Sequence, residues 1–125
     1  MKKIFASLWV FPFLLLAAMP AVQAHESALS TVAGIVMHLN HYPSADEELV
    51  LAGIAADVHA TAGEKLLAGA LSRMRHQVGG ADADALRTLS ADKDANKDER
   101  TLAGVLLGIS HHASAADKDR LKALL

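Results

Sequence analysis

Histidine is the residue type that could carry chemistry in this chain, and three of its seven histidines recur at a fixed interval. His41, His76 and His111 are separated by 35 residues, and the chain contains no cysteine. Imidazole nitrogens bind Zn(II) and Cu(II), and a firm site needs three or four such ligands. The spacing therefore raises the question of whether these side chains form one metal site or repeat one structural role.

The 35-residue interval extends beyond the histidines. Residues 64–89 align with residues 99–124, and a Leu-Ala-Gly triplet begins at Leu67 in the first segment and at Leu102 in the second. A weaker match reaches back to Ala33, which is also followed by glycine. Self-similarity at a fixed period is typical of repeat architectures. The predicted units are residues 26–60, 61–95 and a truncated 96–125.

Each unit has the pattern of two helices, because apolar residues recur at helical spacing and capping residues precede them. The predicted core of the first helices is Val32, Ile35, Val36 and Leu39, then Leu67, Ala70, Leu71 and Met74, then Leu102, Val105, Leu106 and Ile109. The pattern predicts an all-α fold of three tandem helical hairpins of about 35 residues, forming a short solenoid or a compact bundle.

Capping-box sequences begin at Ser44, Thr61 and Asn96, where we expect helices to start. Leu51, Ile54 and Val58 are spaced to line the inner face of the second helix of the first unit.

The histidines at the fixed interval fall at the predicted C-terminal ends of the first helices. A histidine there is favoured electrostatically and can donate to the last free carbonyl groups. Neighbouring helices pack about 8–10 Å apart, which is too far for rings in simple register to share one ion unless the side chains lean together. We therefore interpret His41, His76 and His111 as helix caps, and the alternative is a site for Cu or Zn.

Two further histidines belong to that alternative. His38 lies one turn before His41, and His25 would become the first residue after cleavage of a signal peptide. The α-amino and ring nitrogens of an N-terminal histidine can bind Cu(II) or Ni(II) together. The candidate metal ligands are His25, His38, His41, His76 and His111.

Residues 1–24 have the pattern of a cleaved signal peptide. Lys2 and Lys3 precede an apolar run from Ile4 to Ala18, and small residues at positions 22 and 24 suit a signal peptidase. The run is shorter than the ~20 residues that span a bilayer. We expect a single helical domain, residues 25–125, in a periplasmic or secreted protein without a stable membrane anchor.

Charge and motif content narrow the function. Without Lys2 and Lys3, ten basic residues remain against 14 acidic ones, which argues against a nucleic-acid partner. The sequence has no G-x-S-x-G, H-E-x-x-H or phosphate-binding loop, and we expect no enzymatic activity. Helical repeat arrays commonly bind peptides or proteins. We expect a protein or peptide partner and no cofactor; the alternative is a soluble protein that binds or buffers Cu or Zn.

Overall fold

The computed structural model describes residues 21–125, with side chains from residue 28 onward. The predicted signal peptide, residues 1–24, lies almost entirely outside the described residues, and the side chain of His25 lies outside them as well.

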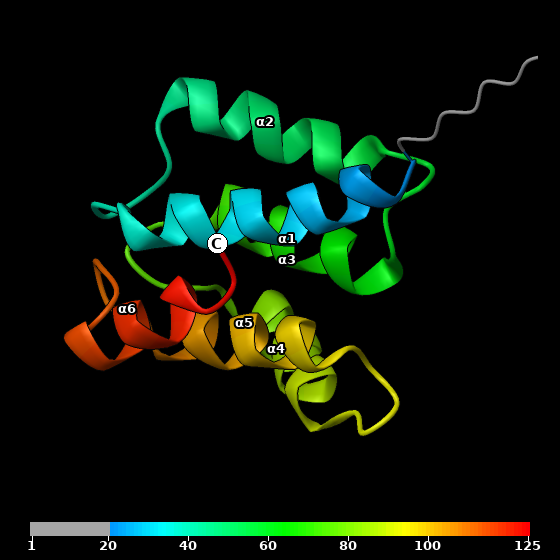
Figure 1. Cartoon of the computed structure of the whole chain (residues 1–125). Coiled ribbons are helices and arrows are strands. Elements are labelled where there is room, and N and C mark those ends of the chain that lie inside the picture. The colour runs from blue at the N-terminus through cyan, green and yellow to red at the C-terminus, as the bar shows by residue number, and fades with distance from the viewer. Residues whose placement is uncertain (1–20) are drawn as a thin grey trace, which may run out of the picture.

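The described part of the chain contains six α-helices and no strand of a sheet, which confirms the all-α class (Figure 1). The helices are α1 (Ala21–Met37), α2 (Ala45–Ala56), α3 (Ala62–Arg73), α4 (Gly80–Ala91), α5 (Lys97–Gly108) and α6 (Ala115–Lys122). None of these helices combines the length and the hydropathy that crossing a bilayer requires.

Helices α1, α3 and α5 contact one another at the centre of a compact bundle (Figure 1). Around them, α2 packs chiefly on α3, α4 on α5, and α6 on α1. Because α6 returns to α1, the arrangement is closed, as in the compact alternative of the prediction. The pairing differs from the predicted hairpins, since the second helix of each predicted unit packs mainly on the first helix of the next. Short reversals at residues 57–61 and 92–96 explain this pairing.

The predicted core of the inner helices is confirmed, since all twelve of those positions are buried. Leu51 is fully buried and Ile54 is half-buried, as expected for the inner face of α2. The prediction for Val58 is wrong, because α2 ends at Ala56 and the Val58 side chain is 81% exposed.

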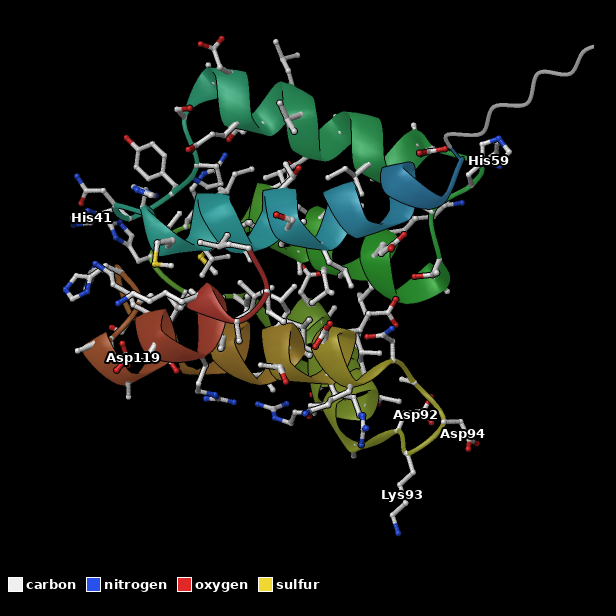
Figure 2. All side chains as sticks on the ribbon, viewed as in Figure 1. His41, His59, Asp92, Lys93, Asp94 and Asp119 are labelled. Atoms are coloured by element: carbon white, nitrogen blue, oxygen red, sulfur yellow. The ribbon has the colours of Figure 1, made fainter. Side chains whose placement is uncertain are left out.

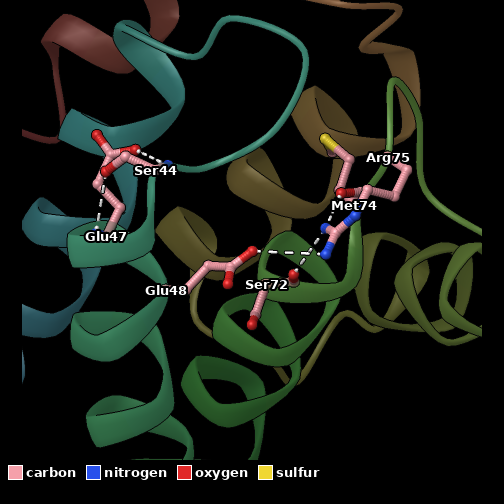
Figure 3. Close-up of polar contacts among 6 residues, drawn as sticks. All are labelled: Ser44, Glu47, Glu48, Ser72, Met74 and Arg75. Atoms are coloured by element: carbon pink, nitrogen blue, oxygen red, sulfur yellow. Dashed lines mark hydrogen bonds and ion pairs between the residues drawn. The ribbon is translucent and has the colours of Figure 1, made fainter.

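The predicted helix starts are confirmed at the level of individual hydrogen bonds. Ser44 and Glu47 form a reciprocal capping box at α2 (Figure 3), and Thr61 and Glu64 form another at α3. Asn96 caps α5 by accepting from two backbone N–H groups. The predicted third box is incomplete, because the Glu99 carboxylate accepts from the Thr61 hydroxyl instead.

Candidate metal centre

His41, His76 and His111 lie in the connections that follow α1, α3 and α5. These helices end at Met37, Arg73 and Gly108, three or four residues before each histidine. The prediction that the histidines end the helices is therefore wrong. Met74 and Ile109, which have extended backbone, end the last turns of α3 and α5 instead. One further residue separates each of them from His76 and His111.

All three histidines have a left-handed backbone, with φ angles of 75°, 69° and 74°. Within residues 21–125 no other residue has positive φ. This conformation costs about 1–2 kcal/mol for a residue with a Cβ and nothing for glycine, and among the other residue types Asn, Asp and His adopt it most often. The chain therefore accepts backbone strain at three sites and places an imidazole at each one.

A closed cycle of backbone hydrogen bonds joins the three connections. The N–H of His41 donates to the carbonyl oxygen of His111 at 2.6 Å, that of His76 to His41 at 2.9 Å, and that of His111 to His76 at 2.7 Å. Each bond joins the connection that follows one inner helix to the connection that follows another. The three side chains are thus anchored by their own backbones at one end of the bundle.

The imidazole rings converge on one another. Their centroids lie 5.1 Å apart for His41 and His76, 5.0 Å for His41 and His111, and 4.9 Å for His76 and His111. One ligand atom from each ring lies within 4.8 Å of the others. The rings lean together, which is the condition under which helices at packing distance could share an ion, because they project from converging turns that follow the helices.

The spacing of the ring nitrogens suits one tetrahedral ion. Two nitrogens bound at about 2.1 Å with a tetrahedral angle lie roughly 3.4 Å apart. Nδ1 of His76 and Nδ1 of His111 are already 3.1 Å apart. The widest pair has to close by no more than about 1.4 Å to reach the tetrahedral spacing, and a side-chain rotation between rotamers covers that distance.

Asn40 orients one of the three rings. Its Oδ1 accepts a hydrogen bond from Nδ1 of His41 at 2.7 Å, so in the neutral ring Nε2 is the nitrogen whose lone pair is available to a metal. Sequence reasoning missed Asn40, because the residues at the same interval are Arg75 and Ser110 and no repeat draws attention to it.

Arg75 fixes the connection around the site. Its Nη1 donates to the carbonyl oxygens of Ser72 and Met74, and its Nη2 lies 3.5 Å from a carboxylate oxygen of Glu48 (Figure 3). The guanidinium carbon lies 5.7 Å from the centre of the Tyr42 ring. These contacts join the connection after α3 to the start of α2, which limits the movement of the turns that carry His41 and His76.

The other candidate histidines do not join the cluster. Among the described residues, the group that could hold a metal contains only His41, His76 and His111. His38 is exposed and its Nδ1 donates to the carbonyl oxygen of Gly34 at 3.2 Å, which is the capping contact that the sequence predicted for the other three. His25 lies outside the described side chains.

The two remaining histidines with described side chains also lie outside the cluster. His112 is exposed, and its Nδ1 contacts the carbonyl oxygen of Ala113. His59 is exposed beyond α2, at the opposite end of the bundle from His41 (Figure 2).

Comparison with protein-family models, curated proteins and solved structures gives no match to this chain. The function has to be argued from the geometry of the three histidines and from the surface around them.

Proposed function

We propose that this protein binds a divalent transition-metal ion through His41, His76 and His111, with Zn(II) as the best fit. The observation that carries the proposal is the convergence of three imidazoles, with ligand atoms within 4.8 Å of one another, on three left-handed turns. Three donors at the corners of a triangle match one face of a tetrahedron, which Zn(II) prefers, whereas Cu(II) prefers a tetragonal set.

A purely structural role accounts poorly for these residues. Glycine would satisfy the same backbone conformation without this strain, because it has no Cβ. The His76 and His111 side chains are exposed, so burial contributes little to holding the rings together. Strained, exposed residues of one type at one point are typical of a functional site. Metal binding explains why an imidazole side chain occupies each of these three positions, which burial does not explain.

We also propose that the chain is exported, with residues 1–24 removed, and that it repeats a unit of about 35 residues three times around the closed bundle. The first proposal is supported by the charge and apolar pattern of the N-terminus. The second is supported by the interval between the triad histidines and by their shared φ angles. Binding or buffering of the metal, rather than catalysis, is the proposed role on the sequence grounds given above.

Isothermal titration of the untagged protein with Zn(II) tests the metal proposal. We expect one ion per chain with a submicromolar dissociation constant. A variant with His41→Asn, His76→Asn and His111→Asn should lose at least 100-fold in affinity, while circular dichroism should show intact helices because asparagine accepts positive φ.

The matched control is His112→Asn, which removes an exposed imidazole next to the triad and should bind Zn(II) as the parent does. Retention of the submicromolar site in the triple variant, or an equal loss in the control, would contradict the proposal.

A protein partner is the second candidate, and one observation favours it. Leu49 and Val50 of α2 are 73% and 46% exposed. At the same interval α4 carries Asp84 and α6 carries Asp119 in place of Leu49. The outer surface of α2 is therefore more apolar than this position in the fold requires.

Photo-crosslinking tests this candidate. A photo-crosslinking residue at position 49 should capture a partner in cells, and the same residue at position 119 should not capture it. Equal labelling at both positions would argue against a docking surface on α2.

A further inference from the structure

Three protein nitrogens leave a tetrahedral ion one ligand short. Closed structural zinc sites have four protein ligands, whereas open sites have three and keep one position for an exchangeable ligand. Within the described residues, no fourth His, Asp or Glu belongs to the cluster formed by His41, His76 and His111.

The free position faces solvent rather than the protein interior. Each triad histidine follows a buried apolar residue two positions earlier in the chain: Leu39 is 6% exposed, Met74 0% and Ile109 3%. On the other side, the side chains of His76 and His111 are exposed and that of His41 is half-buried. An ion held by the three rings is therefore shielded on its inner side and accessible on its outer side.

The carboxylates that follow the triad histidines in sequence are already engaged. Six of them follow a triad histidine by six to eight residues, and each has a hydrogen bond or an ion pair with another group. They are Glu47 with the backbone N–H of Ser44, Glu48 with Arg75, Asp82 with Arg73, Asp84 with Arg87, Asp117 with Arg120, and Asp119 with Lys122. Asp46 is exposed and lies outside the cluster.

The charge of the three protein ligands determines which kind of fourth ligand the metal ion binds most strongly. Three neutral imidazoles leave the full charge of +2 on the ion, whereas thiolate or carboxylate ligands would cancel part of it. We infer that the metal-loaded protein binds a small monodentate anion, such as acetate or azide, which displaces a water molecule from the ion. This inference rests on the proposed metal binding at the same three histidines.

Co(II) provides the probe, because its visible absorption bands report the number and type of its ligands. The untagged full chain is loaded with one equivalent of Co(II) and titrated with sodium acetate and, separately, with sodium azide. We expect each anion to change the bands in a saturable manner with one anion per ion. Measurement of protein-bound cobalt after gel filtration should show that the ion stays in place.

The control is the His112→Asn variant, which should give the same anion titration as the parent. If Co(II) binds through the triad but neither anion alters the bands, the protein itself supplies the fourth ligand and the inference is wrong, while the proposed metal binding stands. If the variant with His41→Asn, His76→Asn and His111→Asn binds Co(II) as the parent does, both the inference and the proposed function fail.

Discussion

The two ends of the inner helices α1, α3 and α5 are built on different principles. At the C-terminal end, positions 41, 76 and 111 are all histidine, all left-handed and all partly or fully exposed. At the N-terminal ends of α3 and α5, positions 64 and 99 are both Glu, whereas position 29, which has the same spacing, is a Leu in the middle of α1. The Glu64 and Glu99 side chains are buried, at 3% and 6% exposed.

The N-terminal end is explained by capping and packing. Thr61 donates its hydroxyl hydrogen to the Glu99 carboxylate and accepts from the backbone N–H of Glu64. A Cβ on Gly63 would lie 2.5 Å from a carboxylate oxygen of Glu99, so the small residue leaves room for the buried carboxylate. This end is held by a cap within α3 and by a side-chain hydrogen bond from the N-cap of α3 to α5. The other end differs, because one residue type with the same left-handed backbone occupies all three positions.

Thr61→Val should give the largest change in stability, at the N-terminal end alone. The variant loses a helix cap and removes one donor from a buried carboxylate, which together lower the free energy of unfolding by roughly 1–3 kcal/mol. Denaturant unfolding measures this loss, and the Zn(II) dissociation constant should stay within about threefold of the parent.

Thr101→Val is the matched control for Thr61→Val, since the Thr101 hydroxyl donates only to the Lys97 carbonyl of its own helix. It should cost less than about 0.5 kcal/mol. A large fall in Zn(II) affinity in Thr61→Val would mean that the two ends of the inner helices are coupled rather than independent.

His76→Gly should show the reverse behaviour. Glycine relieves the strain of positive φ but increases the entropy of the unfolded chain, and the two effects nearly cancel. We expect the metal-free free energy of unfolding to change by less than about 1 kcal/mol, while Zn(II) affinity falls at least 100-fold. A loss of stability above about 2 kcal/mol without metal would indicate that the His76 ring is a packing element.

Asp82→Asn should have the smallest effect, because it removes one ion pair with the solvent-exposed Arg73 at the end of α3. The hydrogen bonds from Arg73 hold the pKa of the Asp82 carboxyl below its ordinary value of 3.8. A lowered pKa stabilises the folded state above the unfolded pKa, and that contribution is lost as the pH falls through the folded pKa. Arg73 is 62% exposed, so the gain is at most about 1 kcal/mol.

Thermal unfolding of the parent and of Asp82→Asn between pH 7 and pH 2 measures this effect. The parent should be slightly more stable near neutrality, and the difference should shrink as the pH falls through the lowered pKa of the Asp82 carboxyl, which lies below 3.8. A difference that stays constant down to pH 2 would show that the ion pair is not its cause.

Much of the fold was predictable because local rules determine it. Helical periodicity identified the buried face of every inner helix, and the capping residues Ser44 and Thr61 marked two helix starts. The pairing of helices was not predictable in this way, because it depends on which loops reverse the chain tightly and on the return of α6 to α1.

The candidate site was predictable only in part. The interval between His41, His76 and His111 was visible in the sequence, and so was the possibility of a shared metal. Their convergence was not visible, because it depends on left-handed turns at residues that carry no glycine and on backbone hydrogen bonds 35 or 70 residues apart in sequence. One usable signal was present, since an identical residue at one position in three units suggests a point where the units meet.

Nitrogen-15 NMR of the imidazole rings during a Zn(II) titration tests the central claim most directly. We expect one equivalent of Zn(II) to shift Nε2 of His41 and Nδ1 of both His76 and His111, as the hydrogen bond of Asn40 and the facing nitrogens require. The rings of His38, His59 and His112 should remain unchanged. Shifts spread over all the histidines without saturation at one equivalent would contradict a single site formed by the three turns.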